Sequence, residues 1–127
     1  MNRGQWLIGA GCIILLGTSI YDAAYYISMT RAMGASDATP TLIAQMKTLW
    51  LMFSLQLIIL SVLAFSASRF ASARQLILLC SLMPLLDTLV LMRFLGTFPG
   101  IILLTLVCLF FWAGAYLLPG PVWGAGN

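Results

Sequence analysis

Two carboxylates stand within stretches of the chain that are otherwise almost wholly apolar, and they are its clearest candidates for chemistry. Asp22 lies in the apolar stretch of residues 6–27, and Asp87 lies in the stretch of residues 75–94. If these stretches cross a bilayer, each ionisable group costs about 2.5–3.5 kcal/mol at membrane depth. Both side chains are therefore expected to face protein or water and to have a polar partner.

The two carboxylates are predicted to lie at similar depth. The stretches that carry them are the first and the third along the chain, so both run in the same direction through the bilayer. At 1.5 Å per residue, Asp22 lies about 8 Å and Asp87 about 4 Å past the middle of its stretch, on the side opposite the N-terminus. Two carboxylates close together resist joint ionisation, so one of them would hold a proton. A pair of this kind can carry protons in coupled transport.

Polar partners for the two acids are predicted in the same half of the bilayer. Lys47 precedes the second apolar stretch, Arg93 ends the third, and both have long side chains that reach inward. Gln56, near the middle of the second stretch, is an uncharged partner. We therefore predict a polar cluster of Asp22, Asp87, Gln56, Lys47 and Arg93. Three roles stay open for it: ion pairs that fix helix register, a site for a ligand or lipid headgroup, or translocation of protons or ions.

The elements that must position these residues are membrane-spanning helices. Of the 127 residues, 62% are hydrophobic and only 7% are charged, whereas soluble domains are about 25% charged. Apolar stretches of about 20 residues match a bilayer, and helices satisfy their own backbone hydrogen bonds in lipid. The predicted fold class is an all-α membrane protein, an antiparallel bundle of four transmembrane helices in a single domain. The spans are predicted at residues 6–27, 48–67, 75–94 and 98–118.

The connections between the predicted helices differ in length. Residues 28–47 form the longest one, in which Pro40 is expected to begin a short interfacial helix. The two later connections are tight, which favours side-by-side packing of consecutive helices. The first helix is expected to be retained and not cleaved as a signal peptide, because Tyr21, Tyr25 and Tyr26 stand where small residues are needed.

Small and hydroxyl-bearing residues mark faces where helices are expected to meet. Ser54 and Ser61 are seven residues apart in the second helix and predict a helix contact through small hydroxyls. Trp6 and Trp123 suit the aromatic belts at the membrane surfaces. In the fourth helix a stripe of mostly small residues with one aromatic is predicted at the packing face, namely Thr105, Cys108, Trp112 and Ala115.

Several classes of activity lack the residues that they need. The chain contains no His, so no Ser/His/Asp set can form. Its three Cys lie in apolar runs without a Cys-x-x-Cys pair, and it has no phosphate-binding loop or zinc motif. No basic run interleaves with aromatic residues, which sets nucleic acid aside as a partner. No catalytic residue, metal or cofactor is therefore predicted, and an enzyme is disfavoured.

The third apolar stretch resembles a known group of proteins. Pro84 and Asp87 form a Pro-x-x-Asp pattern that is similar to bacterial four-helix membrane proteins of unknown function in the DoxX-like families. Lys47 also stands where those proteins tend to have a basic residue. The chain departs from them in lacking an acid just after Lys47 and a His before the fourth helix. The resemblance implies a four-helix bundle in the bacterial inner membrane. Small multidrug transporters share the size, but the sequence around Asp22 lacks their flanking pattern.

The basic residues bear on orientation. The rule that cytoplasmic loops are rich in Lys and Arg, applied to the short second connection with Arg69 and Arg74, favours both termini in the cytoplasm. The basic residues that favour the opposite orientation are Arg31, Lys47 and Arg93, on the other side of the membrane.

The function expected from the sequence is that of a small multi-pass membrane protein without catalytic machinery. Two roles fit, as an accessory subunit of a membrane complex or as a binder of lipid or another hydrophobic ligand. The alternative is a small proton-coupled transporter that uses Asp22 and Asp87. The lipid bilayer is the expected partner, and another membrane protein or further copies of this chain are candidates.

Overall fold

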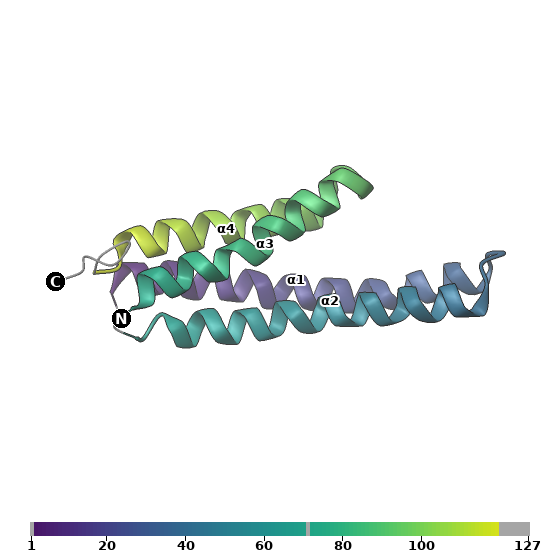
Figure 1. The fold of residues 1–127 in the computed structure, drawn as a ribbon, viewed down its shortest axis with the longest axis horizontal. Coiled ribbons are helices and arrows are strands. Elements are labelled where there is room, and N and C mark those ends of the chain that lie inside the picture. Colours follow the sequence, from purple (N-terminus) through teal and green to yellow (C-terminus); the bar gives the residue numbers. More distant parts are fainter. Residues whose placement is uncertain (1, 71, 120–127) are drawn as a thin grey trace.

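The computed structural model describes residues 2–70 and 72–119, and this part of the chain forms four α-helices (Figure 1). In chain order they are α1 (Arg3–Gly34), α2 (Pro40–Ala67), α3 (Ala73–Leu95) and α4 (Pro99–Leu117). All four are long and apolar enough to cross a membrane. The predicted all-α bundle of four transmembrane helices is therefore confirmed, and the chain is a multi-pass membrane protein. Trp123, predicted at a membrane surface, lies outside the described residues.

Local capping explains where the helices begin and end. The side chain of Asn2 accepts a hydrogen bond from the backbone N–H of Gln5 at 2.9 Å, and the side chain of Gln5 accepts one from the Asn2 N–H at 3.0 Å. This reciprocal cap begins α1. The hydroxyl of Thr39 caps α2, and Pro40 takes a first-turn position that needs no N–H donor. α3 ends at Leu95, and the next residue, Gly96, has a φ of 71° that favours glycine.

The first two helices are longer than the sequence predicts. A connection at residues 28–47 and a separate short helix at Pro40 are expected, but α1 continues to Gly34 and α2 itself begins at Pro40. At 1.5 Å per residue α1 is about 48 Å long and α4 about 29 Å, against a hydrocarbon core of about 30 Å. α1 and α2 therefore project past α3 and α4 as a long hairpin (Figure 1). The predicted bounds follow the polar residues that mark the membrane surface. The helices themselves continue past that surface, α1 as far as Gly34 and α2 from the cap at Thr39.

α1 is the central helix of the bundle. It packs along α2 on one side and along α4 on the other, α3 packs along α4, and α2 and α3 make the smallest contact among these pairs. In Figure 1 the α3–α4 hairpin leans away from the α1–α2 hairpin toward the α3–α4 turn. Consecutive helices are expected to pack side by side, but α2 and α3 contact each other only over a small part of their length. A short connection joins two helix ends but does not fix the angle between the helices, which side-chain packing decides.

Glycines let α1 and α4 approach closely. A Cβ atom on Gly4 would lie 2.7 Å from the carbonyl oxygen of Gly114, and a Cβ on Gly114 would lie 2.6 Å from a carbon of Ile8. The ring of Phe111 fills the space beside Gly11, where an added Cβ would lie 2.8 Å from it. Small residues at such positions are typical of helix pairs in membranes, because dispersion contacts between close backbones drive the association.

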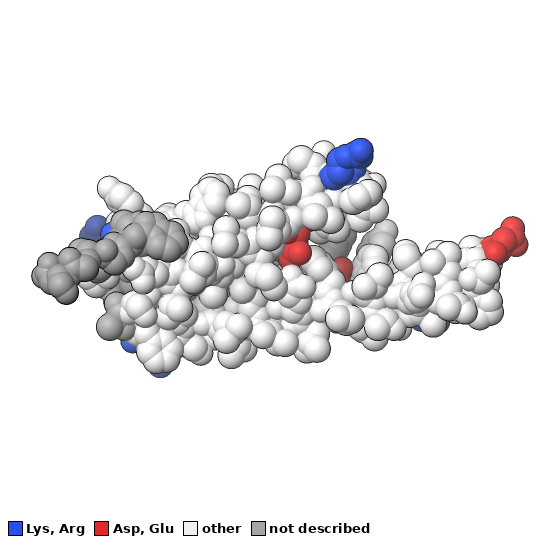
Figure 2. Space-filling view, viewed as in Figure 1, with Lys and Arg blue, Asp and Glu red and all other residues white. Residues whose placement is uncertain are grey.

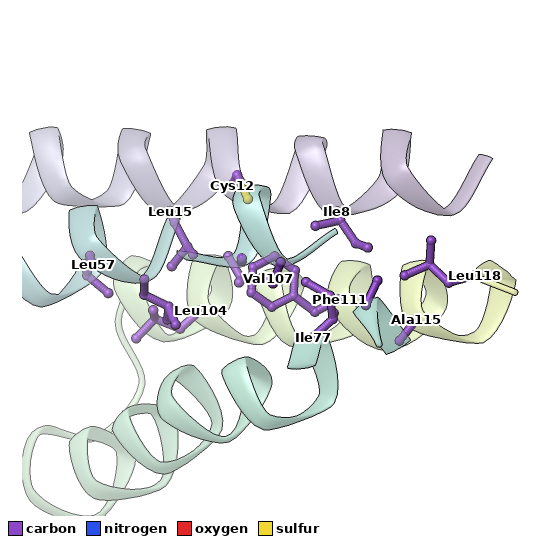
Figure 3. Packing of buried hydrophobic residues seen from close by; sticks show 14 residues of the cluster. Ile8, Cys12, Leu15, Leu57, Ile77, Leu104, Val107, Phe111, Ala115 and Leu118 are labelled. Carbon is purple, nitrogen blue, oxygen red and sulfur yellow. The ribbon is translucent and has the colours of Figure 1, made fainter. Parts of the chain in front are cut away.

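The apolar core is concentrated in the half of the bundle that contains the start of α1. Phe111 of α4 is fully buried and lies in one cluster with Ile8 of α1 and Ile77 of α3 (Figure 3). Within the described part of the chain, α1 has no buried residue after Ser19 and α2 has none before Ser54. The other half, nearer the α1–α2 connection, is therefore loosely packed along these two helices.

Gly4→Ala is expected to destabilise the protein by about 1–3 kcal/mol, because the added methyl group meets backbone atoms of α4 and forces the two helices apart. Gly17→Ala is the matched control, since a Cβ at Gly17 has nothing within 4 Å. The measurement is the free energy of unfolding in detergent micelles, from SDS titration followed by circular dichroism. Equal stability of the two variants would contradict the close approach of α1 and α4.

Candidate functional site

Asp22 is half-buried on α1 and is joined to α2. Its carboxylate Oδ2 accepts a hydrogen bond from the hydroxyl of Ser54. The backbone carbonyl of Asp22 accepts a second bond, from the indole Nε1 of Trp50 at 2.9 Å. About one helical turn before Asp22, the hydroxyl of Ser19 donates to the backbone carbonyl of Ser54 at 3.0 Å. These bonds together tie α1 to α2 at the level where the buried core ends.

Aromatic rings continue this contact toward the α1–α2 connection. The ring of Tyr25 stacks on Trp50 with centroids 6.2 Å apart and on Tyr21 with centroids 6.1 Å apart. Such separations are favourable for aromatic pairs. Tyr25 and Trp50 also line, with Met29 and Met33, an open groove of about 530 Å³ on the projecting hairpin. Tyr25 therefore has a specific partner in Trp50 on the neighbouring helix.

Asp87 is half-buried on α3 and is also joined to α2. The side-chain Nε2 of Gln56 donates a hydrogen bond to Asp87 Oδ2 at 2.9 Å. Pro84 lies one turn earlier in α3, and its carbonyl accepts a bond from the hydroxyl of Thr88 at 2.7 Å. Both Pro84 and Thr88 are buried. The structure therefore brings together Gln56 and Asp87, two members of the predicted cluster.

One turn of α2 supplies the hydrogen-bond donors for both carboxylates. Ser54 and Gln56 are two residues apart, which separates them by about 3 Å along the helix axis. At 3.6 residues per turn they point to nearly opposite sides of α2, Ser54 toward α1 and Gln56 toward α3. The acids therefore lie at similar depth, in agreement with the expectation from their positions in the chain, but they are anchored on different sides of α2.

A hollow opens between the two hairpins beside these acids. Figure 2 shows it between the α3–α4 part of the surface and the α1–α2 part, with red acidic atoms at its edge. Its position agrees with the end of the core at Ser19 and Ser54. Concave surfaces with apolar walls and a few polar groups are where proteins usually bind small molecules. The hollow is therefore the candidate functional site.

The cations predicted as partners of the acids lie elsewhere. Arg93 is exposed near the end of α3, and its guanidinium carbon lies 5.8 Å from the centroid of the Phe94 ring. Lys47 is half-buried in the projecting part of α2. Neither side chain forms an ion pair with Asp22 or Asp87, whose partners are a hydroxyl and an amide. Within residues 2–70 and 72–119, the side-chain donors that hold the two carboxylates are thus neutral.

Ser81 of α3 makes the polar contact between α3 and α4. Its hydroxyl accepts a hydrogen bond from Trp112 Nε1 at 2.9 Å, and its carbonyl accepts one from Cys108 Sγ at 3.9 Å. The predicted stripe of α4 therefore divides, because Cys108 and Trp112 meet α3 whereas Ala115 lies in the core cluster. Among residues 2–70 and 72–119, no three His, Cys, Asp or Glu side chains are grouped as a metal site would require.

Ser54 and Trp50 belong to the site although the sequence does not assign them to it. Ser54 is predicted with Ser61 as part of a helix contact, and both are buried against α1, where the Ser61 hydroxyl donates to the carbonyl of Cys12 at 3.1 Å. Helical spacing could have identified them, because Trp50, Ser54 and Ser61 share one face of α2. An acid at the same depth on the first helix is the natural acceptor for that face.

No protein-family model, no curated protein and no solved structure matches this chain. The resemblance of its third helix to DoxX-like proteins therefore stays a prediction.

A double-mutant cycle of Asp22→Ala with Ser54→Ala is expected to give a coupling energy of about 0.5–3 kcal/mol, because the two side chains share a hydrogen bond. The cycle of Asp22→Ala with Gln56→Ala is the control and should be additive within about 0.5 kcal/mol, since Gln56 bonds Asp87. Unfolding free energies in micelles supply both numbers. Coupling of equal size in the two cycles would mean that the acids share one network and are not separately anchored.

Proposed function

We propose that this chain is a small non-enzymatic membrane protein that binds a lipid or another hydrophobic ligand in the hollow between its two hairpins. The observation that carries the proposal is a pair of half-buried carboxylates beside an opening in an otherwise apolar bundle (Figure 2). A ligand there has apolar helix surface for its hydrocarbon part. Asp22 and Asp87 offer acceptors for a polar head that donates hydrogen bonds.

The energetics of the acids favour such a ligand. Carboxylates next to hydrocarbon are costly, and each has one neutral side-chain donor in this arrangement. A carboxylate oxygen has room for several hydrogen bonds, so Asp22 and Asp87 retain acceptor capacity. A head group with N–H or O–H donors supplies charge-assisted bonds, which are about twice as strong as neutral ones. Binding therefore relieves a cost that the bundle alone leaves in place.

We further propose that the protein lies in the inner membrane of a bacterium, which the resemblance of the Pro84 and Asp87 pattern to DoxX-like proteins supports. Arg69 and Arg74, at the short α2–α3 connection, support an orientation with both termini in the cytoplasm. The projecting α1–α2 hairpin then lies on the opposite side of the membrane.

An accessory-subunit role fits the same architecture, and the projecting hairpin supports it. α1 has 32 residues and α4 has 19, so α1 reaches roughly 20 Å farther at 1.5 Å per residue. The groove at Tyr25, Met29 and Trp50 lies on this projection. Copurification of another membrane protein at fixed stoichiometry in mild detergent would favour this role, as would a defined oligomer of the chain itself. Purification as a single chain with bound lipid would favour the ligand binder.

Native mass spectrometry after extraction in mild detergent tests the ligand proposal. The unaltered protein is expected to retain a lipid or other hydrophobic molecule, and Asp87→Leu should weaken this retention about tenfold or more. A hydrogen bond to a charged group contributes about 1.5–3 kcal/mol, and 1.4 kcal/mol corresponds to a factor of ten. Asp37→Asn is the matched control, because Asp37 is exposed in the α1–α2 connection. Equal retention by Asp87→Leu and the unaltered protein would contradict binding at this site.

A small proton-coupled transporter is the second candidate function. It is favoured by the observation that neither Lys47 nor Arg93 forms an ion pair with the two acids. A carboxyl group without a fixed cation is free to exchange a proton, and intramembrane acids commonly serve as proton relays. Asp22 and Asp87 would then take up and release the coupling proton in the hollow.

Proteoliposomes with an imposed pH gradient distinguish the transporter. Gradient-driven uptake of the lipophilic cation tetraphenylphosphonium is expected for the unaltered protein and for Asp37→Asn, and its loss is expected for Asp87→Asn. The amide keeps the shape of the carboxyl group but cannot exchange its proton. Proton-coupled transport of tetraphenylphosphonium would be excluded by either of two results. One is equal uptake by Asp87→Asn and the unaltered protein, and the other is uptake by the unaltered protein no greater than that of empty liposomes.

A further inference from the structure

The four helices form a ring that is nearly open on one side. α2 packs on α1, α1 on α4 and α4 on α3, whereas the contact that would close the ring, between α3 and α2, is the smallest. Figure 1 shows these two helices drawing apart toward the α3–α4 turn. The hydrogen bond from Gln56 to Asp87 crosses this side of the ring at 2.9 Å.

α3 is attached to the rest of the bundle in two other ways. Ser81 binds it to α4 through Trp112 and Cys108, and α4 is in turn fixed on α1 by the close contact of Gly4 with Gly114. At the other end, the α2–α3 connection is held to α1, because the side-chain Nε2 of Gln5 donates to the carbonyl of Ser68 at 3.1 Å.

α3 is held least firmly on the side that faces α2. The start of α3 contributes the buried side chains of Ala73 and Ile77 to the core cluster. Beyond Ile77, α3 contacts this cluster only through partly buried side chains, Leu78, Cys80 and Leu91. A separation of α2 from α3 therefore widens away from the α2–α3 connection. It requires little loss of packing, since these helices share little contact, but it breaks the bond between Gln56 and Asp87.

We propose that the space between α2 and α3 is a lateral gate to the hollow, and that the hydrogen bond between Gln56 and Asp87 is its latch. The inference rests on the proposed ligand function, because the gate admits a hydrophobic ligand from the bilayer sideways into the site. A head group that bonds Asp87 replaces Gln56 as the donor, so arrival of the ligand and release of the latch are one event. The gate belongs to the α2–α3 side because the other three sides of the ring are packed.

Distance measurement by double electron–electron resonance tests the gate. Spin labels are placed at Met52→Cys on α2 and Val90→Cys on α3, both exposed positions, in a background without the native cysteines and in lipid nanodiscs. Gln56→Leu is expected to move the main distance outward by about 4 Å or more, the separation that one inserted alkyl chain produces. Asp87→Leu should do the same. Asp87→Asn keeps an oxygen acceptor for Gln56 and should remain close to the unaltered distance.

Two controls make the outcome decisive. Ser61→Ala removes a hydrogen bond of α2 to α1, at Cys12, and should leave the α2–α3 distance unchanged. Labels at Ile13→Cys on α1 and Leu109→Cys on α4 report on the packed side, and an unchanged distance there shows that each variant is folded. An unchanged α2–α3 distance in both Gln56→Leu and Asp87→Leu, or equal widening in Ser61→Ala, would overturn the gate.

Failure of the gate and failure of the ligand function give different results. The distances are measured without reference to any ligand, whereas retention of lipid is measured in the mass spectrometer. Lipid retention with a rigid α2–α3 distance would leave ligand binding in place and remove the gate. Widening with no retained lipid would leave a mobile α3 and remove the ligand function.

Discussion

The close contact of α1 with α4 is the constraint on which the arrangement of the other helices depends. Gly4 and Gly114 let two backbones meet, and Phe111 fills the space that Gly11 leaves. Because α4 is held there, α3 follows it through the contacts of Ser81, and α2 takes the free side of α1. The ring of helices is consequently well packed on three sides and has its weakest contact between α2 and α3, which is where the hollow opens.

The absence of water in the hydrocarbon core explains the bonding of the polar side chains. Within residues 2–70 and 72–119, no buried side-chain nitrogen or oxygen lacks a hydrogen-bond partner. Most hydroxyl groups donate a hydrogen bond to a backbone carbonyl, as Ser61 does to that of Cys12. Asp22 and Asp87 differ, because each depends on a side chain of α2 and each borders the hollow. Polar groups that serve packing alone have no need of an opening, and this difference supports the proposal that Asp22 and Asp87 bind a ligand.

One turn of α2 binds both acids, through Ser54 and Gln56. Ser54 belongs to the buried face that binds α1, so its bond to Asp22 lies within a packed contact. Gln56 is only half-buried and spans the weak side of the ring, so its bond to Asp87 lies where the helices separate most easily. Two chemically similar pairs thus have different mechanical roles, the first as an anchor and the second as a latch.

The membrane environment, the four helices and the similar depth of Asp22 and Asp87 could all be predicted from the chain, because apolar length and a rise of 1.5 Å per residue are local properties. Gln56 was predicted as a partner for the same reason of depth. Three features became visible only in the folded bundle: Ser54 bonds Asp22, Lys47 and Arg93 form no ion pair with the acids, and α2 and α3 diverge. These features depend on the direction in which each helix face points and on the angle between helices. Both are set by contacts between residues far apart in the chain, such as Gly4 with Gly114, which spacing along the sequence does not encode.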